Sequence, residues 1–374
     1  MKVVLAPDSY KGSLTQVEVA NIMESAIHSV YPTAQIIKKP MADGGEGTLE
    51  ALLNAVPNSK AVPINVTGPT GEKIETEIGI IHNDIAVIEI AAIAGLPLVE
   101  QRNPYKYTTY GIGEAILEAL NRDLRKFIIG LGGSATNDGG FAMLQALGVN
   151  MYDKEGKSVT KFGSGLRHIY TIDVRKLDNR IEDSEFYIAS DVTNPLFGPK
   201  GASYVFGPQK GATKEQIEQL DQALQNYSKK ILPPNKHALV YTPGAGAAGG
   251  LGFAFLAIGA TIKSGAKLVA ETIGLEEEIM KADIVITGEG KSDYQTMSGK
   301  APSYVANLAR TYGIPVLLIS GTIEDDQNKL NNIFTEIHEI KPKKMDLKRA
   351  INEAEMLLWN KTKEVFNKDF FLKK

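Results

Sequence analysis

Cysteine is absent from this chain of 374 residues, and histidine is scarce, with only five positions. Without cysteine there is no disulfide bond, no thiolate metal ligand and no thiol nucleophile. None of the histidines stands at a metal-ligand spacing such as H-E-x-x-H, so a histidine-held zinc site is not expected. A chain without disulfides is typical of reducing compartments, and we expect a cytoplasmic protein.

An excess of positive charge is also missing. The formal net charge is −3, which provides no broad basic field to hold nucleic acid or an anionic membrane. The apolar run at the N-terminus, Val3 to Ala6, is too short for a secretory signal. Residues 238–262 carry no ionised side chain but contain six glycines and a proline, so we expect a buried helix after a glycine loop there, not a membrane span.

Patterns of strands and helices alternate at both ends of the chain, which favours a parallel sheet. Thr15 and Glu18 have the spacing of a capping box, so a helix is expected to begin there. The other elements expected in these regions are strands at 2–7, 35–41, 61–66, 282–289 and 314–320, and helices at 47–56, 301–312 and 347–366.

The middle of the chain differs, because residues 74–81 and 85–90 flank His82-Asn83-Asp84 in the pattern of a β-hairpin. Further elements expected there are helices at 109–121, 139–147 and 213–232, and strands at 126–131 and 185–192. We therefore predict an α/β protein of two domains. A Rossmann-like parallel α/β domain is made from both chain ends, residues 1–66 and 264–374. A mixed α/β domain, residues 67–263, is inserted, and the active site is expected in the cleft between the two.

Five turns at the ends of expected strands carry the residues most suited to chemistry: 6–13, 41–48, 130–140, 189–196 and 286–293. Four of them place a carboxylate close to the strand end, namely Asp8, Asp43, Asp191 and Glu289. Ligands of open α/β sheets bind outside the carboxyl ends of the strands, so these turns are expected to converge. Glycine loops bind phosphate, lysines such as Lys11, Lys210, Lys291 and Lys300 neutralise it, and carboxylates hold Mg²⁺. Together these groups match the needs of phosphoryl transfer.

Two other motifs resemble nucleotide-binding loops, and one of them leaves an alternative open. Residues 244–249, GAGAAG, match G-x-G-x-x-G, and Glu271 follows at the distance of a ribose-binding acid, so a nicotinamide-dependent oxidoreductase stays open. Residues 288–292, GEGKS, fail as a Walker A loop, because the required first glycine would fall at Val285. Any single Asp-Gly turn also has a purely structural interpretation.

Seven segments, in order, resemble the type-1 glycerate kinase family: APDSYKGSL, ADGGEGT, IGLGGSATNDGG, SDVTNPLFGPKGAS, FGPQKGA, PGAGAAGGLGF and TGEG with the SGKAP that follows it. The resemblance covers residues 2 to about 305. It implies ATP- and Mg²⁺-dependent phosphorylation of D-glycerate, with 2-phosphoglycerate as the more usual product than 3-phosphoglycerate. It also implies a Rossmann-like domain and a second α/β domain with the site between them.

Three positions depart from the pattern of the family that this chain resembles. Lys291 and Ser292 stand where GEGRID has arginine and isoleucine, and Tyr10 stands where phenylalanine is common. Arginine grips a carboxylate or phosphate with two prongs, whereas lysine acts as a point charge. Substrate affinity or choice is therefore expected to differ if this position binds the substrate carboxylate. A kinase for another small hydroxy acid stays open as an alternative.

Roles are assigned to residues as hypotheses. For catalysis we expect Asp191 to act as the base or to orient the hydroxyl, with Asp43 as its rival and Lys11 at the transferring phosphate. Substrate binding is expected from Asp8, Ser9, Ser13, Lys291 and Asp293. Nucleotide binding is expected from Gly132, Gly133, Ser134 and Thr136, and Gly246, Gly249 and Gly250 form either a second anion loop or a close helix packing. Glu289 is the candidate ligand for Mg²⁺, and the oligomeric state is open, with a homodimer as one option.

Overall fold

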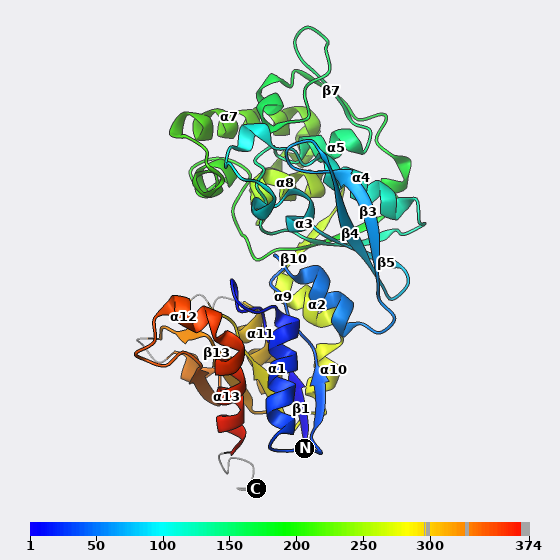
Figure 1. Ribbon diagram of the computed structural model, residues 1–374. Helices are drawn as coiled ribbons and strands as arrows, with labels where there is room; N and C mark the ends of the chain where they lie inside the picture. The colour runs from blue at the N-terminus through cyan, green and yellow to red at the C-terminus, as the bar shows by residue number, and fades with distance from the viewer. Residues whose placement is uncertain (295, 297–299, 326–328, 368–374) are drawn as a thin grey trace. The chain divides into compact units, whose positions relative to one another are not determined.

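The computed structural model describes residues 1–294, 296, 300–325 and 329–367. The chain forms two compact units (Figure 1). The first unit comprises residues 1–43, 50–57 and 264 onward, and the second comprises residues 44–49 and 58–263. The sequence predicted a boundary between two domains after residue 66 and another after residue 263, and this division into domains stays a prediction. None of the described helices is long and apolar enough to cross a membrane.

The first unit contains a parallel sheet of five strands in the order β15-β13-β11-β1-β2. Its central strands read KVVL, IVIT and VLLIS and are almost wholly buried, as expected where helices cover both faces of a parallel sheet. A small parallel pair, β12 and β14, lies apart from this sheet. The strands are β1 (Lys2–Leu5), β2 (Gln35–Lys38), β11 (Ile284–Thr287), β12 (Lys291–Ser292), β13 (Val316–Ser320), β14 (Thr322–Ile323) and β15 (Glu336–Glu339).

The strand order of this sheet is 2-1-3-4-5 when its strands are numbered along the chain. This is the flavodoxin-type doubly wound order, not the Rossmann order 3-2-1-4-5-6, although both are parallel α/β sheets. The order reverses between β1 and β11. The loops that leave these two neighbouring strands diverge, so their carboxyl ends are where a ligand is expected.

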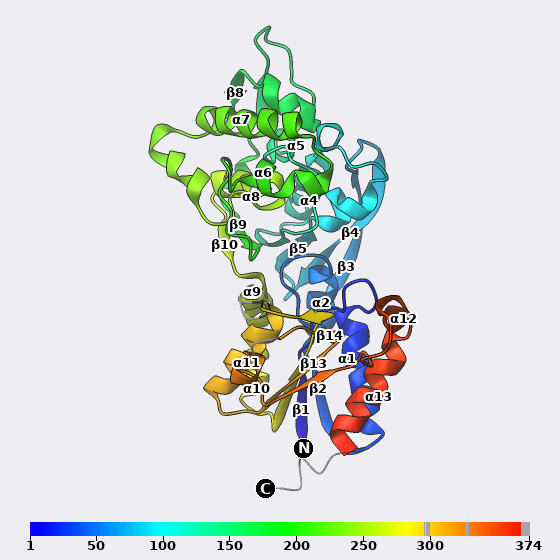
Figure 2. The same ribbon diagram turned by 90° about the vertical axis from the view of Figure 1, so that its left-hand side faces the viewer.

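Helices cover both faces of this sheet: α1 and α13 lie on one side, and α10 and α11 on the other (Figure 2). The predicted capping box is confirmed, because Thr15 Oγ1 accepts from Glu18 N at 3.3 Å and Thr15 N donates to the Glu18 carboxylate at 2.8 Å. The helices are α1 (Gln16–His28), α9 (Gly265–Thr272), α10 (Leu275–Ile279), α11 (Ala301–Thr311), the 3₁₀ helix η8 (Leu330–Asn332), α12 (Leu347–Asn352) and α13 (Ala354–Asn367). Helix α2 (Thr48–Ala55) begins in the second unit and continues in the first.

The single closing helix predicted over 347–366 is wrong. The chain breaks at Glu353, whose φ of −102° and ψ of 13° leave the helical region. Ala350 before the break and Leu358 after it both enter the core of this unit. Two helices, α12 and α13, thus bury apolar side chains from both segments.

The second unit contains a mixed sheet of six strands in the order β10-β9-β6-β5-β4-β3. The hairpin predicted at 74–81 and 85–90 is confirmed as antiparallel β4 and β5, and β5, β6, β9 and β10 are parallel. The strands are β3 (Lys60–Thr67), β4 (Lys73–Ile81), β5 (Ile85–Glu89), β6 (Lys126–Gly130), β9 (Glu185–Ala189), β10 (Thr261–Lys263) and a separate antiparallel pair, β7 (Asn150–Tyr152) and β8 (Thr171–Asp173).

A strand was expected at 61–66 in a parallel sheet of the N-terminal region, and this prediction of its pairing is wrong. The strand is β3 and pairs antiparallel with β4 along its whole length. Only residues 68–72 connect the two strands. So short a connection permits a hairpin, whereas a parallel neighbour needs a crossover of a dozen or more residues.

The helices of the second unit pack on this sheet around one large apolar core. Helix α7 repeats the capping box of α1, with Thr213 and Gln216 as its two partners, and α8 is the buried helix expected after the glycine loop. The helices are α3 (Ala91–Ala94), α4 (Tyr110–Leu120), α5 (Phe141–Ala146), α6 (Ala202–Phe206), α7 (Lys214–Ile231) and α8 (Ala247–Ala257). The 3₁₀ helices are η1 (Leu96–Leu98), η2 (Pro104–Lys106), η3 (Gly163–His168), η4 (Asn179–Ile181), η5 (Pro208–Lys210) and η6 (Pro234–Tyr241).

Candidate active site

A cavity of about 290 Å³ lies in the first unit, at the carboxyl edge of its parallel sheet. Segments that follow all five strands contribute to its walls. Its charged side chains are Asp8, Lys11, Asp43, Glu289, Lys291 and Lys300. The cavity therefore occupies the switch point of the strand order and collects acidic and basic groups from segments almost 300 residues apart.

The loop between β1 and α1 is held in one conformation by its own backbone and by β13. Ser13 N and Leu14 N both donate to Tyr10 O, and Gly12 adopts the positive φ of 84° that this tight turn needs. The buried Tyr10 hydroxyl donates to Ile319 O at 2.6 Å. These contacts fix the direction in which Asp8 and Lys11 leave the loop.

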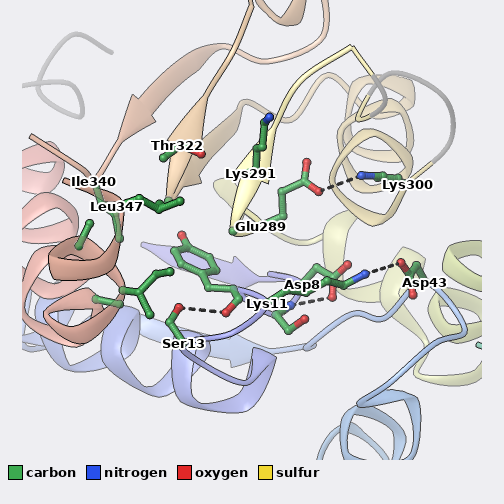
Figure 3. A pocket seen from close by; sticks show the side chains of 17 residues that line it. Asp8, Lys11, Ser13, Asp43, Glu289, Lys291, Lys300, Thr322, Ile340 and Leu347 are labelled. Atoms are coloured by element: carbon green, nitrogen blue, oxygen red, sulfur yellow. Dashed lines mark hydrogen bonds and ion pairs between the residues drawn. The ribbon is translucent and has the colours of Figure 1, made fainter. Parts of the chain in front are cut away.

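Asp8 is a buried carboxylate of this cavity, with 7% of its surface exposed, the same fraction as Glu289. Burial, followed by the negative charge of Asp43, raises the pKa of Asp8 to about 7, although Ser9 N donates to the carboxylate at 2.6 Å. The Lys11 ammonium lies 3.1 Å from the Asp43 carboxylate (Figure 3). Desolvation alone would lower the pKa of Lys11, but the charges of Asp43 and Asp8 raise it overall. Near neutral pH, Asp8 can therefore both accept and release a proton.

Glu289 is held by partners from its own neighbourhood. Its Oε1 accepts hydrogen bonds from Thr296 Oγ1 at 2.6 Å and Ser292 Oγ at 3.1 Å. Figure 3 shows its Oε2 facing the Lys300 ammonium, at 3.9 Å. Burial raises the pKa of Glu289. Ser292 also shares a hydrogen bond with Ser320 Oγ at 2.7 Å, which ties this corner of the cavity to the end of β13.

Lys291 lies at the rim of the cavity. Its ammonium is 2.7 Å from Glu324 and 4.0 Å from Asp293, and half of its side chain is exposed. Of the residues predicted for catalysis, substrate and metal, the cavity brings together Asp8, Ser9, Lys11, Ser13, Asp43, Glu289 and Lys291. Asp293 lies beside Lys291 and outside the cavity walls, and the hydroxyl of Ser13 donates to Tyr10 O at 2.9 Å.

The remaining predicted residues belong to the second unit, where β5, β6 and β9 end side by side. Asp191 follows β9 and is exposed, and the glycine loop follows β6. Segment 44–49 packs against this edge: the Glu89 carboxylate accepts from Gly47 N at 3.2 Å and Leu49 N at 3.0 Å. A Cβ on Gly132 would lie 2.6 Å from Gly45 Cα. Close backbone packing therefore accounts for Gly132 without an anion.

Lys210 closes the glycine loop from within the second unit. Only 2% of the residue is exposed, and its ammonium donates to Ser134 Oγ at 2.9 Å and to Thr136 O at 2.6 Å. Burial lowers the pKa of Lys210 to about 7, against the opposing charge of Asp138. The ammonium thus points into the protein, and not to a phosphate at the surface as the sequence suggested. A nucleotide role for Gly133, Ser134 and Thr136 stays a prediction.

The second glycine motif is occupied by packing. Gly249 and Gly250 have positive φ values of 70° and 88°, and a Cβ would lie 2.1 Å from Thr136 O at Gly249 and 2.2 Å from Pro195 O at Gly246. The segment before this motif is the 3₁₀ helix η6, not a strand. A dinucleotide fingerprint requires a strand before it, so the nicotinamide alternative loses its structural context.

Comparison with known proteins identifies the family. The model of the glycerate kinase family matches residues 3–368. The chain belongs to the glycerate kinase family. It is 44% identical over 349 residues to glycerate 2-kinase of Escherichia coli (strain K12), covering 91% of each chain. It is 45% identical over 332 residues to a glycerate kinase of Bacillus subtilis (strain 168), covering 88% of this chain and 87% of the relative.

A solved structure from Salmonella typhimurium LT2, described as a candidate glycerate kinase 2, has the same mixed α/β fold with a TM-score of 0.85 and 41% identity. The match covers 98% of this chain and 97% of that one. Membership of the glycerate kinase family makes this protein a kinase, and a kinase implies ATP as its phosphate donor.

The carboxylates of the cavity fit a magnesium ion that is shared with phosphate oxygens and water. Within the described ranges, no group of three or more His, Asp or Glu side chains is arranged to hold a metal. Mg²⁺ needs only one or two carboxylates when phosphate oxygens and waters complete its shell. Asp43 fits that need, and a cation beside it would also offset the negative charge that raises the pKa of Asp8. Glu289, the ligand predicted from sequence, has one carboxylate oxygen engaged by two hydroxyls and the other facing Lys300.

One wall of the cavity was not predicted from the sequence. Ile340 and the helices α12 and α13 supply an apolar wall formed by Ile340, Leu347, Ala350, Ile351 and Ala354. The signal available was the apolar spacing of positions 347, 350, 351 and 354 on one helical face, from which only a helix was predicted.

Proposed function

We propose that this protein transfers the terminal phosphoryl group of ATP to a hydroxyl of D-glycerate, with Mg²⁺, and forms 2-phosphoglycerate. The observation that carries the proposal is the cavity at the switch point, which gathers Asp8, Asp43 and Glu289 with Lys11 and Lys300. Phosphoryl transfer needs positioned charges and a group that orients the attacking hydroxyl, and little other chemistry from the protein.

Asp8 is our choice for the group that takes the hydroxyl proton in this cavity. General bases work best when their pKa lies close to the working pH, and the pKa of Asp8 is raised to about 7. Lys11, at 3.1 Å from Asp43, supplies a positive charge for phosphate oxygens or the substrate carboxylate. Mg²⁺ would be held by Asp43 together with phosphate oxygens and water, where it neutralises phosphate charge. Asp43 and Asp191, chosen from the sequence as bases, stay candidates.

One assay tests the reaction and its regiochemistry together. The protein is incubated with ATP, Mg²⁺ and D-glycerate, ADP release is followed, and enolase is added to the product. Enolase acts on 2-phosphoglycerate and not on 3-phosphoglycerate, so immediate formation of phosphoenolpyruvate supports the proposal. ADP release without phosphoenolpyruvate would overturn the 2-phosphate assignment.

The same assay separates the second candidate function, phosphorylation of another small hydroxy acid. Lys291 carries that alternative, since it stands where the family pattern has arginine and lies at the rim of the cavity. A panel of lactate, tartronate, L-glycerate and D-glycerate is compared by kcat/KM. A higher kcat/KM for any other acid than for D-glycerate would contradict the proposed substrate. Loss of turnover with EDTA is expected in every case, because Mg²⁺ accompanies ATP.

A further inference from the structure

The cavity of the first unit has two chemically different ends. Asp8, Asp43 and Lys300 mark the charged end, whereas Ile340 and Leu347 lie at the opposite end (Figure 3). The apolar end continues over Ala350, Ile351 and Ala354 of α12 and α13.

Large apolar side chains are left open to solvent at this end. Leu347 is 59% exposed and Ile351 is 38% exposed, and both line the cavity. Covering apolar surface with a ligand stabilises the complex, in proportion to the apolar area removed from water. A ligand that uses the whole cavity therefore needs an apolar part as well as an anionic part.

Glycerate lacks such a part, because it is a three-carbon acid with two hydroxyls. A nucleoside triphosphate has both, with a flat base at one end and a chain of phosphates at the other. We propose that the first unit holds the nucleoside of ATP on the apolar wall formed by Ile340, Leu347, Ala350, Ile351 and Ala354, with the phosphates directed to Lys11 and Lys300. This inference rests on the proposed function for the choice of ATP.

Two observations favour this place over the glycine loop of the second unit. Gly132 and Gly249 are required by close backbone contacts, and Lys210 is enclosed by the loop it would otherwise offer to phosphate. The cavity also lies where the strand order of a 2-1-3-4-5 sheet reverses, which is the usual ligand position of that sheet.

The test uses the full chain and the double variant Leu347→Ser with Ile351→Ser. Both side chains are partly exposed, so the variant is expected to fold. Calorimetric titration with ADP is expected to show a Kd about tenfold higher than wild type, whereas the Kd for tripolyphosphate, which has no base, is unchanged. Met356→Ser is the matched control, because Met356 is 52% exposed on α13 and lies outside the cavity walls.

Three results would overturn the subsite. The first is an unchanged Kd for ADP in the double variant. The second is a rise in the KM for glycerate with the KM for ATP unchanged, which would place the acid on this wall. The third is a wild-type dimer that the double variant converts to monomers with normal ADP binding, which would make the wall an interface between copies. If wild type binds ADP as expected but does not phosphorylate glycerate, the proposed function fails and the nucleoside subsite stands.

Discussion

Each unit buries one ionisable side chain whose pKa has moved to about 7, and the surroundings of the two groups are opposite. Asp8 of the first unit reaches this value from below, because burial and the charge of Asp43 oppose its ionisation. Lys210 of the second unit reaches it from above, because burial opposes its protonation. Asp8 lines an open cavity, whereas Lys210 is closed in by Ser134 Oγ and Thr136 O.

The difference separates a group that a ligand can relieve from one that it cannot. A cation or a substrate that enters the cavity can offset the repulsion between Asp8 and Asp43, and this relief favours binding. The Lys210 ammonium already has its hydrogen bonds within the protein. We infer that Asp8 serves the reaction and that Lys210 serves the shape of the glycine loop, and four predictions test this contrast.

The largest effect is expected from Asp8→Asn. If Asp8 takes the hydroxyl proton, kcat falls by about 10²–10⁴. The stability of the ligand-free protein changes in the opposite direction. The native state holds the Asp8 proton up to about pH 7, whereas the unfolded chain loses it near 3.8, so wild-type stability falls as the pH rises through this window. The variant escapes that loss and is expected to have a higher melting temperature than wild type at pH 8.

Asp123→Asn is the matched control for the loss of one carboxylate. Its side chain is 99% exposed and lies in the second unit, so neither kcat nor the melting temperature is expected to change. Normal turnover of Asp8→Asn would contradict the assignment of Asp8 and return the role to Asp43 or Asp191. A melting temperature below that of wild type at pH 8 would show that the buried carboxylate stabilises the fold.

Lys210→Ala is expected to act mainly on stability. The substitution leaves Ser134 Oγ and Thr136 O without the buried ammonium that bonds them, and each such loss costs about 1–3 kcal/mol. Lys210→Met keeps most of the volume and removes the buried charge, so its cost is expected to be smaller. Urea denaturation of both variants measures the difference, with the exposed Lys229→Ala as control. Wild-type stability of Lys210→Ala together with lost turnover would make Lys210 a catalytic residue.

Local and non-local features of the molecule differed in how far the sequence could predict them. The capping box of Thr15 and Glu18 was predictable because both partners lie within one helical turn. The partner of β3 was not, since the strand pattern of 61–66 says nothing about direction, and the five-residue connection to β4 decided it. The break at Glu353 was missed because the apolar spacing continues across it.

The candidate site shows the same division. Asp8, Asp43 and Glu289 were found from the sequence because each follows a strand, and parallel strands end at one edge of a sheet. The apolar wall of Leu347 and Ile351 was missed, because helical spacing cannot distinguish a face that packs on the core from one that borders a cavity. The burial of Lys210 was equally hidden, since it depends on the path of a loop more than 70 residues earlier in the chain.

The pH dependence of stability is the third prediction and isolates Lys210 further. Between about pH 7 and its ordinary pKa of 10.5, the unfolded chain binds a proton at this lysine that the native state does not. Stability from this group therefore rises with pH across that window, by at most about 1.4 kcal/mol per pH unit. The unfolding free energy of wild type minus that of Lys210→Met, measured from pH 7 to 10, is therefore expected to rise with pH. A constant difference would show that Lys210 stays protonated in the native state, held by Asp138.

The smallest effects are expected from the two capping boxes, one in each unit. Thr15→Ala and Thr213→Ala each remove a side chain that accepts from the third residue of its helix, and each is expected to cost about 1 kcal/mol. Thr15 follows directly on the loop that carries Asp8 and Lys11, whereas Thr213 starts a helix of the second unit. If the β1–α1 loop positions the cavity, Thr15→Ala raises the KM for ATP or glycerate in addition to its cost in stability, and Thr213→Ala alters stability alone. Equal KM values in both variants would show that the contacts of Tyr10 with Ile319 and Leu14 hold the loop in place without the help of the helix that follows.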